Sequence, residues 1–192
     1  MVNDPIRIIL SVAKALDACG IRYLVGGSLA SSISGEPRSS MDIDLVVELS
    51  ISQVDSLTEA LKEEFLVDPD VLRRAVEHTS SANILHEETS TKIDLFVLGG
   101  TPLDGEQMNR RVRMKVASEP DRYIYTYTPE DILLQKLRWF RLGNEVSERQ
   151  WRDVLGIVRT QGKKLDDSWL LRGAQTLGVQ DLLERALREG AG

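Results

Sequence analysis

The sequence predicts an α+β fold, in which a mixed α/β region precedes a region built from helices alone. Up to Thr128, segments with strand-like and helix-like periodicity alternate along the chain, and after Thr128 every periodic segment is helical. The chain has 192 residues, of which 42% are hydrophobic and 28% charged, as in ordinary globular proteins of one or two small domains. We therefore expect an α/β domain over residues 1–128 and a helical domain over residues 129–192.

Residues 1–128 begin with a helix, because residues 5–19 carry an apolar stripe at helical spacing. This helix should end at Gly20, where a left-handed C-terminal cap fits. Further predicted helices cover residues 29–33, 52–65 and 70–78, with Ser52 as a capping residue. Short apolar or alternating runs predict strands over residues 22–25, 41–49, 82–87, 92–98 and 111–116.

Residues 129–192 contain helix signals only. Thr128 can cap a helix that has Pro129 at its first position, and Ser147 with Gln150 has the spacing of a capping box. The predicted helices cover residues 129–142, 148–160, 167–177 and 179–188.

The composition limits which metals and which cell compartment are expected. Cys19 is the only cysteine, so an internal disulfide is excluded and a cytoplasmic protein is expected. One cysteine and two histidines cannot form a Cys/His zinc site, which leaves carboxylates as ligands for Mg²⁺ or Mn²⁺. Since the longest apolar runs are far too short to cross a bilayer, we expect no membrane association.

The net charge of −6 argues against a protein wholly dedicated to nucleic-acid binding. Basic residues nevertheless cluster within residues 109–115, at Arg110, Arg111, Arg113 and Lys115. This run could be a solvated strand edge, or it could contact a polyanionic acceptor.

Three aspartates are the strongest candidates for a functional site. Asp42 and Asp44 lie two residues apart in a segment of strand periodicity, so both carboxylates point to the same face. Asp94 is a single acid within another apolar strand-like segment. Because converging carboxylates repel one another unless a cation neutralises them, the three together indicate a metal site.

Upstream of these acids, Gly26, Gly27 and Ser28 follow a predicted strand and open a predicted helix. Glycines allow the backbone to approach a phosphate closely, and the amide groups at a helix N-terminus bind anions. A phosphate-binding turn is therefore possible here, although most Gly-Gly-Ser sequences are plain turns.

This order of motifs resembles the nucleotidyltransferase superfamily that includes DNA polymerase beta, and within it the AbiEii-type, or MenT-like, minimal nucleotidyltransferases. The resemblance covers nearly the whole chain and rests on Gly26-Gly27-Ser28, Arg38-x-Ser40-x-Asp42-Ile43-Asp44, Asp94, Pro129 to Leu137, and Arg149 to Asp153. Ser40 stands where that group often has Thr. The resemblance implies a small mixed-sheet nucleotidyltransferase core followed by a C-terminal helical bundle.

The resemblance also implies a role for each site residue. Asp42 and Asp44 would bind two magnesium ions that bridge the phosphates of a nucleoside triphosphate such as ATP, and Asp94 would complete the site and orient or deprotonate the acceptor hydroxyl. Ser28 and the Gly27 amide, at the end of the turn that begins with Gly26, would hold the β- and γ-phosphates.

Two residues of the helical region each have two interpretations. Lys136 would reach a triphosphate oxygen or the ribose, with an exposed helix lysine as an equally open alternative. Asp153 matches a family acid, but a second acid that often follows it is absent, so an ordinary helix charge is the preferred interpretation.

The function that follows is transfer of a nucleoside monophosphate from a nucleoside triphosphate to an acceptor hydroxyl. By resemblance the acceptor could be a tRNA 3′ end, as in toxins of toxin–antitoxin systems, or a protein or a small molecule, and a cognate antitoxin could accompany the chain. The alternative is a nucleotide-binding or scaffold module without turnover that acts through a protein partner. The third acid, Asp94, speaks against that alternative, since a pure binder does not need it.

Overall fold

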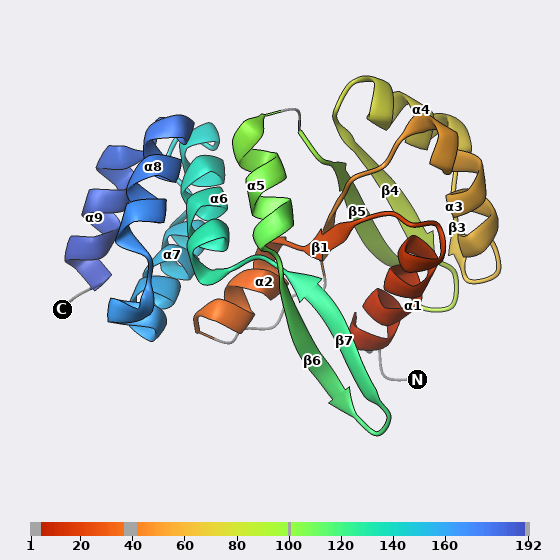
Figure 1. Cartoon of the computed structure of the whole chain (residues 1–192), viewed down its shortest axis with the longest axis horizontal. Helices are drawn as coiled ribbons and strands as arrows, with labels where there is room; N and C mark the ends of the chain where they lie inside the picture. Colours follow the sequence, from red (N-terminus) through yellow and green to blue (C-terminus); the bar gives the residue numbers. More distant parts are fainter. Residues whose placement is uncertain (1–4, 37–41, 100, 191–192) are drawn as a thin grey trace. The chain divides into compact units, whose positions relative to one another are not determined.

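The computed structural model describes residues 5–36, 42–99 and 101–190, which group into two compact units (Figure 1). The first unit comprises Met1–Gly26 and Ser40–Thr126, and the second comprises Gly27–Ser39 and Tyr127–Gly192. The second unit thus takes in helix α2 (Gly27–Ser34), because this helix packs on helices from the C-terminal part of the chain. Among the described residues, no helix is both long and apolar enough to cross a membrane.

The described part of the first unit contains a mixed sheet of seven strands in the order β3-β4-β5-β2-β1-β7-β6. β2 is parallel to β5, and β1 is parallel to β7, whereas the other neighbouring pairs are antiparallel. The predicted mixed sheet is therefore confirmed. The strands are β1 (Tyr23–Val25), β2 (Ile43–Val47), β3 (Phe65–Leu66), β4 (Ser81–His86), β5 (Thr91–Val97), β6 (Val112–Ser118) and β7 (Asp121–Thr126).

Among the described residues of the first unit, four α-helices accompany this sheet: α1 (Pro5–Ala18), α3 (Val54–Leu61), α4 (Pro69–Glu77) and α5 (Pro102–Arg110). α1 packs against α3 and β7, and α4 packs against β4 and β5. The middle of the apolar stripe predicted for α1 is buried, with Ile9 and Leu16 fully inaccessible. Gly20 follows with a φ of 65°, which confirms the predicted left-handed end of this helix.

The structure departs from the sequence prediction at a few local positions. Phe65 belongs to β3 and not to the preceding helix, because it pairs with His86 and packs edge-on against that ring at 5.2 Å. Ser50, not Ser52, starts the 3₁₀ turn before α3. β7 and α5 were not predicted, although Thr101 forms the capping box of α5 with Asp104. Arg38, Ser40 and Met41, which belong to the motif around the paired acids, lie outside the described residues.

The second unit is helical, as predicted for the C-terminal half. Its described helices are α2, α6 (Pro129–Leu142), α7 (Glu148–Gln161), α8 (Asp167–Leu177) and α9 (Gln180–Gly190). The predicted caps are confirmed: the Thr128 side chain accepts from the Asp131 amide, and the Ser147 side chain accepts from the Gln150 amide. α6 packs on α7 and α8, α9 packs on α7, and α2 packs on both α6 and α7.

Candidate active site

The predicted acids lie on two neighbouring strands of the first unit. Asp44 belongs to β2 and Asp94 to β5, and the parallel register places the two residues directly opposite one another. Asp42 lies immediately before β2, two residues from Asp44, so it continues the same face of the strand. Asp94 therefore comes from the strand next to the one that carries Asp44, although the two residues are fifty positions apart in the sequence.

The opposite face of these strands is part of the hydrophobic core. Residues that alternate with the acids are at most 1% exposed, namely Ile43, Leu45, Ile93 and Leu95. A register slip of one residue would turn this apolar row towards solvent and the carboxylates into the core. The core thus holds the two strands in the register that keeps Asp44 and Asp94 side by side on the more accessible face.

A lysine that the sequence analysis did not single out lies beside these acids. Lys92 Nζ is 2.9 Å from Asp94 Oδ2. This hydrogen bond to Asp94 raises the pKa of Lys92 above its usual value, and the negative charges of Asp42 and Asp44 add to the increase, whereas burial opposes it. The ammonium group therefore offsets part of the repulsion between the carboxylates. Lys92 lies two residues before Asp94, and residues two apart on a strand share a face. Strand alternation therefore places the lysine beside this acid.

Carboxylate oxygens are suitable ligands for a magnesium ion, but the described protein side chains alone do not surround such an ion. Within residues 5–36, 42–99 and 101–190, no group of three or more His, Cys, Asp or Glu side chains is arranged to hold a metal ion. Magnesium usually keeps several waters and binds through one or two carboxylates together with substrate phosphates. Asp44 and Asp94, on adjacent strands, can supply those carboxylates. The donor set thus fits Mg²⁺ or Mn²⁺ that arrives with a triphosphate.

The glycine turn has the predicted strand–turn–helix context. The Gly26 amide donates a 2.9 Å hydrogen bond to the carbonyl oxygen of Asp44, which holds the end of β1 beside the start of β2. Gly27 has a φ of 55°, a conformation that residues with a side chain rarely adopt. It is the first residue of α2, followed by Ser28. The nucleotide-binding roles of Gly26, Gly27 and Ser28 stay predictions.

Lys136 and Asp153 form a buried ion pair within the second unit. Lys136 Nζ lies 2.8 Å from Asp153 Oδ2, and the two side chains are 9% and 6% exposed. The hydroxyl of Ser31 on α2 also donates to this Asp153 oxygen, at 3.4 Å. The interpretations of Lys136 as an exposed helix lysine and of Asp153 as an ordinary helix charge are therefore wrong. A nucleotide-binding role for Lys136 stays a prediction.

Several solved structures have a similar fold. An antigenic nucleotidyltransferase-like protein from Paracoccidioides brasiliensis is 18% identical, with a TM-score of 0.55 over 98% of this chain and 94% of that chain. The lincosamide antibiotic adenylyltransferase LnuA is 14% identical, with a TM-score of 0.50 over 82% of this chain and 96% of that one. ANT(2″)-Ia is 12% identical, with a TM-score of 0.55 over 90% of this chain and 95% of that one. At these identities the likeness shows the fold.

Sequence comparison identifies the family. No curated protein matches the chain. A family model described as "Nucleotidyl transferase AbiEii toxin, Type IV TA system" matches residues 14–176. This range includes the two strands with the aspartates as well as Lys136 and Asp153. The chain therefore belongs to the AbiEii family of nucleotidyl transferase toxins of Type IV toxin–antitoxin systems.

Proposed function

We propose that this nucleotidyltransferase is metal-dependent and that Asp42, Asp44 and Asp94 form its catalytic site. One observation carries the proposal: Asp44 and Asp94 are paired in register on strands whose other face is buried core. Two neighbouring, partly buried carboxylates destabilise the fold through desolvation and mutual repulsion. A divalent cation bound between them would remove this repulsion. The family supports nucleotidyl transfer as the activity.

The reaction moves a nucleoside monophosphate from a nucleoside triphosphate to an acceptor hydroxyl. The acceptor oxygen forms a bond to the α-phosphorus, the bond between the α-phosphorus and the bridging oxygen breaks, and pyrophosphate leaves with that electron pair. Asp94 would orient the hydroxyl and accept its proton, while Asp42 and Asp44 would face the phosphates. Bound magnesium would supply the positive charge that aligns the attacking and leaving oxygens.

In this proposal, a bound metal ion would displace the Lys92 ammonium from Asp94. Its ammonium neutralises Asp94 when no divalent cation is present, and the lysine side chain is 53% exposed. A long exposed side chain can move into solvent at little cost, because surface ion pairs contribute at most about 1 kcal/mol. Metal binding would therefore replace one cation by another at Asp94.

The proposal covers three classes of acceptor hydroxyl, namely the tRNA 3′ end, a protein side chain and a small molecule. Two structures of similar fold are described as lincomycin-bound and as a complex with adenylyl-2″-tobramycin. These descriptions support the inclusion of hydroxyl-rich antibiotics among the acceptors tested. Membership of a toxin family supports a cognate antitoxin as a further partner.

The test is to incubate the protein with each of the four α-³²P-labelled nucleoside triphosphates, with Mg²⁺ or Mn²⁺. Total tRNA, lysate protein and a panel of antibiotics are supplied as separate acceptors. We expect label to move to one acceptor class, and pyrophosphate to be released. Asp44→Asn should abolish transfer, whereas the matched control Asp55→Asn, on the surface of α3, should retain it. Nucleotide binding without pyrophosphate release in every reaction would instead support the module without turnover.

A further inference from the structure

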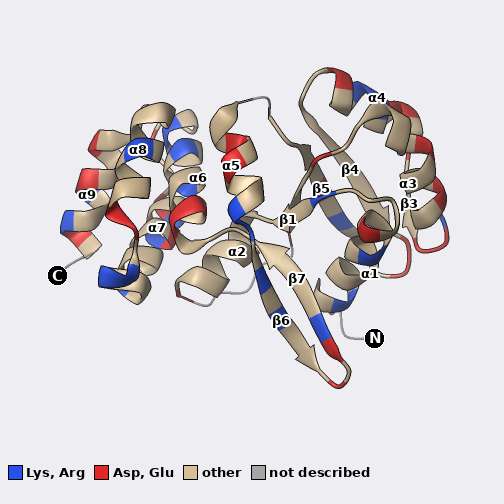
Figure 2. Cartoon of the chain, viewed as in Figure 1, with Lys and Arg blue, Asp and Glu red and all other residues tan. Residues whose placement is uncertain are grey.

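The hairpin of β6 and β7 carries a row of basic and aromatic side chains, and Lys and Arg lie on both of its strands (Figure 2). Arg113 pairs with Tyr125, and Lys115 pairs with Tyr123. Residues two apart on a strand share a face, so these four side chains lie on one side of the hairpin. Arg111, directly before β6, extends the row. We call these five residues the Arg–Tyr face.

Guanidinium groups stack on tyrosine rings along this face. The guanidinium carbon of Arg113 lies 3.8 Å from the centre of the Tyr123 ring, and that of Arg111 lies 4.7 Å from the centre of the Tyr125 ring. A stacked guanidinium uses its flat face for the ring, so its N–H groups can still donate at the edge, as Arg111 Nη1 does to the Met108 carbonyl oxygen at 2.9 Å. The Nε of Arg111 is buried without an acceptor among the described residues.

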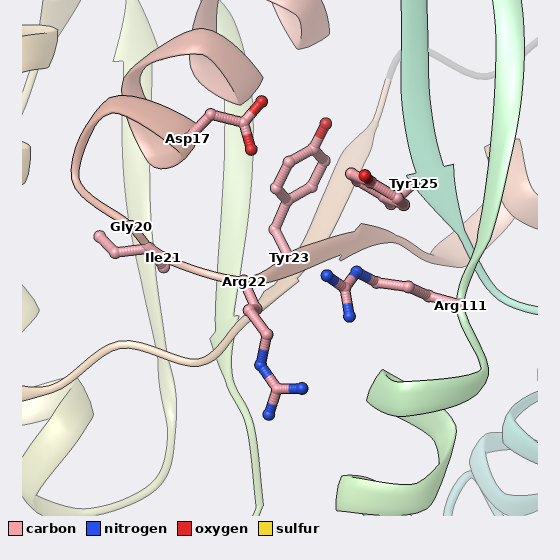
Figure 3. A pocket seen from close by; sticks show the side chains of 7 residues that line it. All are labelled: Asp17, Gly20, Ile21, Arg22, Tyr23, Arg111 and Tyr125. Carbon is pink, nitrogen blue, oxygen red and sulfur yellow. The ribbon is translucent and has the colours of Figure 1, made fainter.

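A pocket of about 220 Å³ opens at the base of this face (Figure 3). Its aromatic walls are Tyr23 and Tyr125, whose rings meet edge to face at 5.8 Å between centres. The other lining residues are Asp17, Gly20, Ile21, Arg22 and Arg111. The volume is below the range of about 300–1,000 Å³ typical of sites for drug-sized ligands. The pocket therefore suits one planar ring system and not a whole nucleotide.

The pocket offers both hydrogen-bond donors and an acceptor. Asp17 supplies the acceptor and Arg111 a guanidinium donor; burial raises the pKa of Asp17, and the positive charge of Arg111 opposes this change. Burial, followed by the charge of Asp17, raises the pKa of Tyr23 to about 12, which keeps its phenol protonated. Arg22 is held in place by Glu48 and by a 2.7 Å hydrogen bond to Asn109. Carboxylates accept from exocyclic amino groups of bases, and arginine donates to their carbonyl oxygens.

We propose that the Arg–Tyr face binds single-stranded nucleic acid, with phosphates on Arg113 and Lys115 and one unstacked base in the pocket. Tyrosine rings and guanidinium planes that alternate with positive charge match the bases and phosphates of a single strand. An acidic polypeptide would satisfy the charges but has no bases for the pocket. Lys115 is engaged with Asp121 at 2.6 Å, an exposed pair that a phosphate can displace.

This surface is separate from the catalytic acids within the first unit. Tyr23 pairs with Val47, three residues along β2 from Asp44, and residues an odd number apart point to opposite faces of a strand, so Tyr23 and the acids lie on opposite faces of the sheet. A strand bound here leaves the carboxylates free. The inference deepens the proposed function and rests on it for one consequence, namely that a nucleic acid is the acceptor.

The test measures binding without catalysis. Fluorescence anisotropy of labelled 12-nucleotide RNA and DNA single strands is recorded in EDTA, with the Asp44→Asn variant as the parent protein. Two phosphate contacts, at Arg113 and Lys115, predict a slope of about −1.4 for log affinity against log salt concentration, and Arg113→Gln should reduce its magnitude by about 0.7. Tyr125→Leu, which removes one aromatic wall of the pocket, should weaken binding about fivefold to a hundredfold through lost stacking. Lys163→Gln, a matched change in an exposed residue of the second unit, should have no effect.

Two further measurements keep the inference falsifiable. Arg113→Lys should retain the salt slope, because it keeps the charge, and the melting temperatures of all variants are compared to exclude unfolding. Equal binding by the Arg113→Gln and Lys163→Gln variants would overturn the inference, as would equally effective competition by polyglutamate of matched charge. Binding without any transfer to nucleic acid would contradict only the nucleic-acid acceptor, whereas transfer without binding at this face would contradict only the inference.

Discussion

Replacement of Asp44 by Asn should separate stability from activity. The change keeps the size and shape of the side chain but removes a negative charge that the proposed metal requires. Asp44 lies directly opposite Asp94, so without metal the two carboxylates repel one another. The variant should therefore be at least as stable as the wild type while nucleotidyl transfer falls by several orders of magnitude, since electrostatic stabilisation dominates phosphoryl-type transfer.

The size of the stability effect follows from the strand geometry. Adjacent strands are about 4.8 Å apart, and two unit charges at that separation repel by roughly 3 kcal/mol at an effective dielectric constant of about 20. The Lys92 ammonium offsets part of this repulsion, and solvent screens the half-buried Asp44. We expect a net gain of at most about 1 kcal/mol, or about 2–4 °C in melting temperature for a protein of this size.

Thermal unfolding with and without ligand is the assay. With Mg²⁺ and a nucleoside triphosphate at a hundredfold excess over the dissociation constant, the wild type should gain about 2.7 kcal/mol, or about 5–11 °C. The Asp44→Asn variant should gain far less stability from the same ligands, although its fold and its glycine turn are unchanged. If neither protein responds to any of the four nucleotides with Mg²⁺, the site does not hold a metal–nucleotide complex and the reasoning is refuted.

Three further predictions concern other charged or titrating groups. Lys92→Gln should lower the Mn²⁺ concentration at half-maximal thermal shift severalfold, because no ammonium then competes for Asp94; an unchanged midpoint would contradict this competition. Lys136→Met should reduce the free energy of unfolding in urea by about 3–5 kcal/mol, because Asp153 is left buried and unpaired, and a second change, Asp153→Leu, should recover most of the loss; a fully stable single variant would disprove the buried pair. The pKa of Tyr23 is raised to about 12 chiefly by burial, so the folded protein holds the phenol proton more tightly than the unfolded chain. Its contribution is complete below about pH 10 and is lost as the pH rises towards 12; Tyr23→Phe should flatten this part of the stability profile, and identical profiles would refute the assignment.

Local signals accounted for most of the helices. The caps at Thr128 and Ser147 and the left-handed Gly20 were predicted from a few neighbouring residues, since helix ends depend on hydrogen bonds within one turn. The same kind of signal is present at Thr101 and Pro102, which cap and begin α5. Strand β7 was not predicted: its partners are β6, next to it in sequence, and β1, about a hundred residues away.

The sequence by itself determined that Asp42 and Asp44 share a face, because strand alternation is a local property, and that any metal must be held by carboxylates, because the chain lacks the residues for another site. Only the tertiary structure decided that β5 lies parallel to β2 with Asp94 opposite Asp44, and that Lys92 joins them. Pairing between strands fifty residues apart depends on which register buries the apolar faces of both, and local periodicity carries no information about that choice.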